Sequence, residues 1–177
     1  GDGGAIFTSD DALAKILRSI RIHGEGADKY DNIRLGINGR LDTLQASILL
    51  EKLTIFPNEV VMRNKVAEYY TNSLPTGYRA PFVPDNYLSS WAQYSILFDK
   101  NNDRARMIKL LKEQNIPAMI YYKIPLHLQQ IFNYLGYQEG NFPVSEETSE
   151  NILSIPMHPY LETSQQDQIL ETLHAAG

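Results

Sequence analysis

Two aperiodic segments of the chain gather polar side chains whose types could do chemistry. The first runs over residues 36–42 and reads G-I-N-G-R-L-D, with the amide of Asn38 and the guanidinium of Arg40 just before an expected helix. Arginine offers a planar fork of donors to carboxylate or phosphate, and a helix N-terminus adds backbone amides. An anion site is one interpretation of this pattern. The alternative is that Asn38 forms a turn and Arg40 pairs with Asp42 on the surface.

The second segment runs over residues 121–129 and reads Y-Y-K-I-P-L-H-L-Q. Tyr121, Tyr122, His127 and Gln129 supply phenols, an imidazole and an amide, which can both donate and accept hydrogen bonds. Sugars are bound by groups of this kind. The alternative is a tyrosine face packed against the core, with His127 as a lone histidine satisfied inside the protein.

Several other chemistries lack their residues. The chain has no cysteine, which excludes disulfides, thiolate metal sites and cysteine catalysis. The opening G-D-G-G matches neither G-x-G-x-x-G nor a P-loop and reads more simply as a tight turn. No G-x-S-x-G motif of a serine hydrolase occurs. The chain has four histidines: His23, His127, His158, His174. Their spacing is not that of zinc ligands, so no metal site is expected.

Length and composition indicate a globular protein. The 177 residues, 43% hydrophobic and 21% charged, predict about one domain, or one domain plus part of another. Sixteen basic against twenty-one acidic residues give a net charge of -5, the wrong sign for a nucleic-acid partner. No apolar run approaches the ~18 residues of a membrane span and no secretion signal is present, so we expect a cytoplasmic protein. Because the chain opens on Gly1 without methionine, we expect a piece of something longer.

The first part of the chain predicts one helix followed by a long loop. After a strand-like stretch over 5–8, residues 8–11 offer helix caps, and a helix is expected over 10–22. Its apolar residues have the spacing of a buried stripe: Leu13, Ile16, Leu17, Ile20. Gly24 suits a left-handed cap. The loop over 25–40 is rich in glycine, aspartate and asparagine, and loops longer than about 12–15 residues are often functional.

The remainder predicts long helices and then a small α/β domain. Helical periodicity over 41–56 is interrupted by Pro57 and resumes over 60–74, as one long span or two abutting helices. After about residue 76 an alternating strand is expected over 92–98, followed by a helix that Asp103 caps and a short β segment over 118–122. Further helices are expected over 126–135, 144–154 and 164–174.

The order of the motifs resembles a known family. The runs are G-D-G-G-A-I-F-T, R-S-I-R-I-H-G, G-I-N-G-R-L-D-T-L-Q-A, Y-Y-K-I-P-L-H-L-Q and S-I-P-M-H-P. In order and spacing they resemble the C-terminal half of the DegT/StrS-type nucleotide-sugar aminotransferases. Within the family, the chain is most similar to enzymes that aminate the keto group of a UDP-linked uronate in bacterial surface-polysaccharide synthesis.

This resemblance implies part of a fold-type I transferase with α/β architecture and pyridoxal 5'-phosphate as cofactor. Glutamate would be the amino donor and a nucleotide-linked keto sugar the acceptor, in a homodimer with shared active sites. Residues 1–40 would end the large cofactor domain and include the dimer-crossing loop. Residues 41–75 would form connecting helices, and residues 76–177 the small C-terminal α/β domain.

The resemblance also implies roles for individual residues. Asn38 would bind the cofactor phosphate across the dimer, and Arg40 would reach toward the acceptor. Tyr121, His127 and Gln129 would line the sugar pocket, and the long loop adds two further substrate-binding candidates: Tyr30, His23. The lysine that carries the cofactor would lie just upstream of Gly1. No catalytic residue is therefore assigned in this chain, and its own lysines lie in helices or polar surroundings where desolvation would not activate an amine.

Two other functions remain open from the sequence. A dehydratase of the same family keeps the fold and cofactor but replaces the lysine by histidine, at a position upstream of Gly1. From another class, the chain could be a non-catalytic module for sugar-nucleotide binding or dimerisation.

Overall fold

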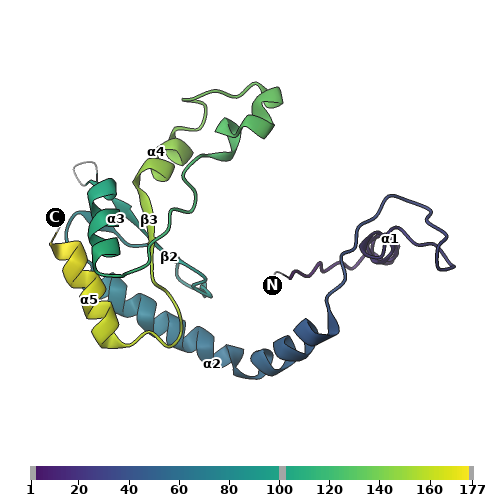
Figure 1. Cartoon of the computed structure of the whole chain (residues 1–177), viewed down its shortest axis with the longest axis horizontal. Coiled ribbons are helices and arrows are strands. Elements are labelled where there is room, and N and C mark those ends of the chain that lie inside the picture. Colours follow the sequence, from purple (N-terminus) through teal and green to yellow (C-terminus); the bar gives the residue numbers. More distant parts are fainter. Residues whose placement is uncertain (1–2, 100–102, 176–177) are drawn as a thin grey trace. The chain divides into compact units, whose positions relative to one another are not determined.

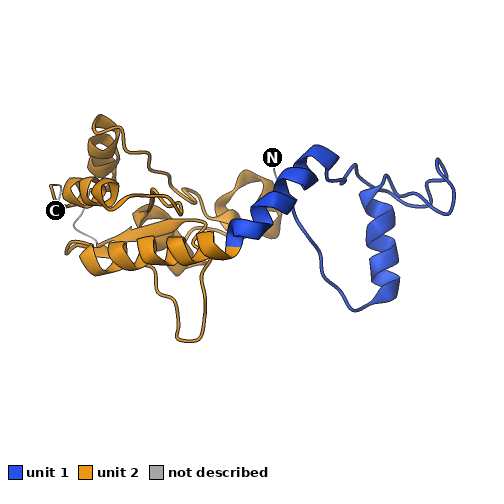
Figure 2. Cartoon of the chain, turned by 90° about the horizontal axis from the view of Figure 1, so that it is seen from below, with its two compact units in different colours: residues 1–56 blue, residues 57–177 orange. Residues whose placement is uncertain are grey.

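The computed structural model describes residues 3–99 and 103–175 (Figure 1). The chain divides into two compact units, residues 1–56 and 57–177, with the boundary inside helix α2, Thr43–Ser73 (Figure 2). The helix continues through Pro57, which confirms the single long span among the two alternatives. Because proline has no N–H, one backbone hydrogen bond is missing at this boundary. The assignment of residues 1–40, 41–75 and 76–177 to parts of two domains stays a prediction.

Helix α1, Asp11–Arg21, begins and ends as its sequence predicts. The Asp10 carboxylate accepts hydrogen bonds from the backbone N–H groups of Ala12 and Leu13, at 2.8 and 3.0 Å, which satisfies donors that the first turn leaves unpaired. At the other end, Gly24 adopts φ +79° and its N–H donates to the Ser19 carbonyl at 2.8 Å. Glycine adopts this left-handed conformation with little strain, which suits the end of a helix.

The apolar stripe of α1, however, is not buried, and this part of the prediction is wrong for the described chain. Leu13 is 42% exposed and Ile16 is 41% exposed. An amphipathic helix buries its apolar face only against another element. None of the described residues packs on α1 closely enough to bury any of its residues. The strand expected over 5–8 does not form either, since those residues have no strand partner among the described residues.

Residues 25–40 contain no helix or regular strand, as predicted. Backbone contacts nevertheless fold the segment back on the end of α1, through isolated bridges between Ile22 and Asn38 and between Glu25 and Asn32. A Cβ atom on Gly36 would lie 2.1 Å from the Gly24 nitrogen. The close approach of the two backbone segments therefore requires glycine at position 36.

The unit of residues 57–177 is built on a three-stranded antiparallel sheet of order β1-β2-β3. Strands β2 and β3 are labelled in Figure 1. The strands are β1, Tyr78–Arg79, β2, Tyr94–Phe98, and β3, Ile152–Ile155. Strand β2 confirms the alternation predicted over 92–98, because Tyr94, Ile96 and Phe98 are buried and the residues between them are less so. In the register of the sheet, Tyr94 pairs with Ile155 and Ile96 with Leu153.

Helices account for most of the rest of this unit. Helix α3, Arg104–Glu113, is capped by Asp103, and α5 is Thr163–His174, which confirms both predicted helices. Helix α4, Pro143–Asn151, is shorter than predicted because β3 begins at Ile152. The helix expected over 126–135 is instead two 3₁₀ segments, η1, Leu126–Leu128, and η2, Gln130–Leu135. No residue of η2 is buried, so tertiary packing does not support a longer α-helix there.

The short β segment expected over 118–122 is reduced to a single bridge between Met119 and Ser154. Pro117 lacks a backbone donor just before it, which limits pairing at that end. The core of the unit lies between the sheet and the helices α2, α3 and α5: Val66, Ala67, Tyr70, Tyr94, Ile96, Phe98, Met107, Leu111, Leu153, Ile155, Ile169, Leu170, Leu173. Among the described residues, no helix is both long enough and apolar enough to cross a membrane.

Candidate functional site

The Asn38 and Arg40 side chains contact each other. Arg40 Nε donates a hydrogen bond to Asn38 Oδ1 at 3.0 Å, and both residues are exposed. The bond occupies the amide oxygen and so orients the Asn38 Nδ2 donors away from Arg40. It uses one of the five N–H donors of the guanidinium. The pair therefore presents amide and guanidinium donors side by side, a combination suited to an anion.

Backbone hydrogen bonds hold this pair at the end of α1. The N–H of Ile37 donates to the Ile20 carbonyl, and the N–H of Gly39 donates to the Arg21 carbonyl, both at 2.8 Å. These bonds fix the chain on either side of Asn38. The side chain therefore projects from a supported backbone rather than from a free loop.

The two other candidates in this unit differ in their surroundings. His23 adopts φ 56° and donates its backbone N–H to the Ile37 carbonyl at 3.0 Å, next to Asn38. Tyr30 is 84% exposed and its ring lies 5.1 Å from Lys29 Nζ. Within the unit, the structure thus brings His23 close to Asn38 along the backbone, whereas Tyr30 lies on the exposed turn of the loop. Substrate binding by either residue stays a prediction.

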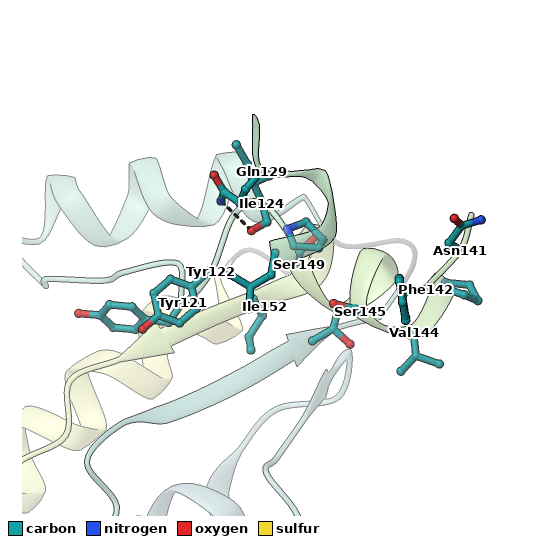
Figure 3. A pocket seen from close by; sticks show the side chains of 14 residues that line it. Tyr121, Tyr122, Ile124, Gln129, Asn141, Phe142, Val144, Ser145, Ser149 and Ile152 are labelled. Carbon is teal, nitrogen blue, oxygen red and sulfur yellow. Dashed lines mark hydrogen bonds between the residues drawn. The ribbon is translucent and has the colours of Figure 1, made fainter. Parts of the chain in front are cut away.

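The unit of residues 57–177 contains a cavity of about 890 Å³ (Figure 3). The segment over 121–129 forms one wall, and α4 with the residues just before it forms the other. Pockets of about 300–1,000 Å³ are the size that small ligands occupy. Hydroxyl and amide groups interrupt a largely apolar lining: Tyr121, Tyr122, Gln129, Asn141, Ser145, Thr148, Ser149.

Two of the predicted sugar-pocket residues, Tyr121 and Gln129, line this cavity. The Tyr121 ring packs against the Tyr122 ring, with centroids 5.7 Å apart. Gln129 Nε2 donates to the Ile124 carbonyl at 3.2 Å, across the turn that contains Pro125 (Figure 3). The bond orients the Gln129 carboxamide within its wall. Contact of either residue with a substrate stays a prediction.

His127 lies behind the cavity wall rather than on it. The side chain is 8% exposed, and the residue is not among those that line the cavity. Its Nε2 atom lies 2.8 Å from Glu146 Oε1, and its ring packs on Phe142 with centroids 4.8 Å apart. Its position therefore gives no support to a direct contact with a sugar in the cavity, and that role stays a prediction.

Glu146 is a residue of this site that sequence reasoning missed. Its carboxylate also accepts from the backbone N–H groups of Gly140, at 2.8 Å, and Phe142, at 3.1 Å. The Gly140 N–H contributes most to holding the Glu146 pKa below its ordinary value, and the Phe142 N–H and His127 lower it further. A local signal was present, since Pro143 and an acidic residue in the next turn are typical of a helix start. No sequence signal links Glu146 to His127, nineteen residues earlier.

Comparison with solved structures defines the class of protein. A DegT DnrJ EryC1 StrS aminotransferase from Brucella abortus is 43% identical with a TM-score of 0.84, over 96% of this chain and 44% of that one. A putative sugar aminotransferase from Streptococcus pneumoniae, in its PLP form, shares the fold at 22% identity and a TM-score of 0.84, over 96% of this chain and 44% of that one. The chain thus corresponds to the C-terminal part of a fold-type I aminotransferase, which confirms the predicted fold class.

The sequence places the chain more narrowly. A UDP-2-acetamido-2-deoxy-3-oxo-D-glucuronate aminotransferase from Pseudomonas aeruginosa is 43% identical over 165 residues, 93% of this chain and 44% of that protein. The model of the DegT/DnrJ/EryC1/StrS aminotransferase family matches residues 1–174, and the chain belongs to this family. It spans less than half the length of the relatives compared here.

Proposed function

We propose that this chain is the C-terminal part of an enzyme that transfers an amino group from glutamate to the keto group of a UDP-linked uronate, for bacterial surface polysaccharides such as O-antigen. The observation that carries the proposal is the 43% identity, over 93% of this chain, to an aminotransferase named for a UDP-linked 3-oxo-glucuronate. Relatives of the family that act on nucleotide sugars support the substrate class. The enzyme works as a cytoplasmic homodimer with shared active sites.

The donors at Asn38 and Arg40 fit a cofactor with a phosphate group. Because Asn38 Oδ1 accepts from Arg40 Nε, the Nδ2 group is oriented to donate, which suits a phosphate oxygen. Pyridoxal 5'-phosphate, when bound, supplies the electron sink for amino-group chemistry. In this proposal Asn38 holds the phosphate and Arg40 holds an anionic group of the acceptor. The lysine that carries the cofactor lies upstream of Gly1.

The cavity of residues 57–177 fits the sugar part of such a substrate. Tyr121, Gln129 and Ser149 offer polar groups beside apolar side chains, the mixture that a pyranose ring with hydroxyl groups requires. Among the described residues that line the cavity there is no lysine or arginine. A cationic partner for the uronate carboxylate therefore comes from outside this lining.

A labelling experiment tests the proposal. The full-length protein is incubated with pyridoxal 5'-phosphate, [¹⁵N-amino]glutamate and UDP-2-acetamido-2-deoxy-3-oxo-glucuronate, and the nucleotide sugars are analysed by mass spectrometry. We expect a UDP-amino sugar that carries ¹⁵N, together with an equal amount of 2-oxoglutarate. A product that has lost water and carries no ¹⁵N would favour the dehydratase. Binding without turnover would favour the non-catalytic module.

A dTDP-linked keto sugar serves as the comparison substrate in the same assay. The UDP-linked uronate should be used with the higher kcat/KM. If the dTDP-linked sugar is preferred, the uronate assignment is wrong while the aminotransferase assignment stands.

A further inference from the structure

Two backbone N–H groups from the loop just before α4 and the imidazole of His127 from η1 converge on the Glu146 carboxylate. Oε2 accepts from the Gly140 backbone, and Oε1 accepts from the Phe142 backbone and contacts His127 Nε2 at 2.8 Å. The carboxylate is 16% exposed. Phe142 is the cap residue of α4, and its own side chain makes no capping bond. Glu146 thus closes the N-terminus of its own helix and reaches a different segment at the same time.

This geometry determines the charge of the Glu146 carboxyl and the position of the hydrogen on the His127 ring. The lowered pKa of Glu146 keeps its carboxyl ionised at neutral pH, and an ionised carboxylate only accepts hydrogen bonds. The His127 Nε2 atom must therefore carry the hydrogen. Glutamine cannot replace Glu146, because its one amide oxygen leaves an NH₂ group facing a backbone N–H. A donor at position 127 and an ionised acceptor at position 146 are both required.

The pair joins the two walls of the cavity. On one side, His127 is the middle residue of η1. Three residues within two positions of it line the cavity: Pro125, Leu126, Gln129. On the other side Glu146 stands in α4, next to the lining residue Ser145. Figure 3 shows the two groups of lining side chains on separate segments. The bond between His127 and Glu146 and the packing of His127 on Phe142 link these walls.

We propose that His127 and Glu146 are positioning residues that set the spacing between the two walls and thereby select the acceptor sugar. The inference rests on the proposed function, because it takes the cavity as the sugar site. His127 acts through Glu146 and does not touch the substrate. Loss of the pair lets α4 and η1 separate, which weakens recognition of the sugar and leaves recognition of glutamate unchanged.

The test uses four variants of the full-length enzyme. Glu146→Gln removes the acceptor charge, and His127→Leu removes the donor. His127→Gln keeps an N–H donor at the end of a side chain of similar reach and should restore most of the function. Glu139→Gln makes the same change of charge at an exposed residue of the preceding loop and is the matched control. Each half-reaction is measured alone by stopped-flow absorbance, with glutamate and with the UDP-linked keto-uronate.

Glu146→Gln and His127→Leu should lower kcat/KM for the keto sugar about tenfold to a hundredfold, the size of one lost charged hydrogen bond, mainly through KM. The glutamate half-reaction should stay within about twofold of the wild type. The double variant should be no worse than either single variant, because the two residues act as one unit. If Glu146→Gln fails to fold, the comparison of His127→Leu with His127→Gln still tests the positioning role.

The outcomes that overturn the inference differ from those that overturn the proposed function. A wild-type enzyme that aminates no nucleotide sugar overturns the proposed function, and the sugar selection with it. A wild type that is active, with Glu146→Gln equal to Glu139→Gln, overturns the positioning role alone. Equal losses in both half-reactions, or a His127→Gln variant as poor as His127→Leu, also overturn it.

Discussion

Arg40 Nε donates to Asn38 Oδ1 at 3.0 Å, so the two residues that the sequence marks for anion binding form one unit. We predict that this unit acts across a dimer. An Asn38→Ala/Arg40→Ala variant of the full-length protein is mixed with a variant that lacks the cofactor-binding lysine. If the unit acts in trans, each mixed dimer has one intact site and one site spoiled twice, and activity returns. Mixed dimers that stay inactive would place the unit in its own subunit's site.

Close packing of Gly24 and Gly36 should make the loop sensitive to a single methyl group. A Cβ atom at position 36 would lie 2.1 Å from the Gly24 nitrogen, which is backbone and cannot move aside cheaply. We expect Gly36→Ala to lower the free energy of unfolding by more than ~1 kcal/mol and to weaken the cofactor binding that we propose for Asn38. Gly4→Ala is the control, because no atom of the described residues lies within 4 Å of the position that its Cβ would take. Urea unfolding and cofactor titration measure both effects, and equal behaviour of the two variants would contradict the prediction.

Arg104 should hold the C-terminal end of α4. Its Nη1 atom donates to the Ser149 carbonyl at 2.6 Å and to the Ile152 carbonyl at 3.1 Å, where the helix gives way to β3. Burial lowers the pKa of the guanidinium, although the group remains charged at neutral pH. We expect Arg104→Met to cost about 1.5–3 kcal/mol of unfolding free energy, the range for hydrogen bonds to charged groups. Arg106→Met is the control, and calorimetry of both variants gives the difference. Equal losses in the two would show that these carbonyl contacts contribute little.

Tyr121 should affect the sugar half-reaction more than the glutamate half-reaction, because it lines the cavity in the unit of residues 57–177. We expect Tyr121→Phe to reduce kcat/KM for the keto sugar by about fivefold to a hundredfold, the loss of one hydrogen bond to a substrate hydroxyl. The rate with glutamate should change little. Stopped-flow measurement of each half-reaction checks this, with Tyr134→Phe as the control at an exposed residue of η2. A similar loss in both halves would assign Tyr121 to the chemistry.

The contribution of Glu146 to stability should depend on pH. Its folded-state pKa lies below the value of about 4.3 for an unfolded glutamate, so the stabilisation is complete above that value. It is lost as the pH falls through the folded-state pKa. The difference in unfolding free energy between the wild type and Glu146→Gln should therefore shrink as the pH falls from about 6 to 3. Urea unfolding across this range measures it, and a difference that does not vary with pH would refute the linkage.

Local patterns determined much of the secondary structure. Asp10 and Asp103 predicted the starts of α1 and α3, because a carboxylate before a helix satisfies its first N–H groups. Alternation predicted β2, since successive side chains of a strand point to opposite faces. The motif order also indicated the family, which the comparisons confirm. The capping and alternation signals lie within a few residues of one another, whereas the motif order spans most of the chain.

The tertiary structure decided those features that depend on residues far apart in the sequence. Strand β3 replaces the end of a predicted helix because Leu153 pairs with Ile96, fifty-seven residues earlier, and a local pattern carries no record of such a partner. In the same way, the sequence marked His127 as a candidate for substrate binding. Its place behind the cavity wall depends on its contact with Glu146, which the sequence did not indicate. A buried imidazole takes its role from the group it contacts, and the fold alone brings that group within 2.8 Å.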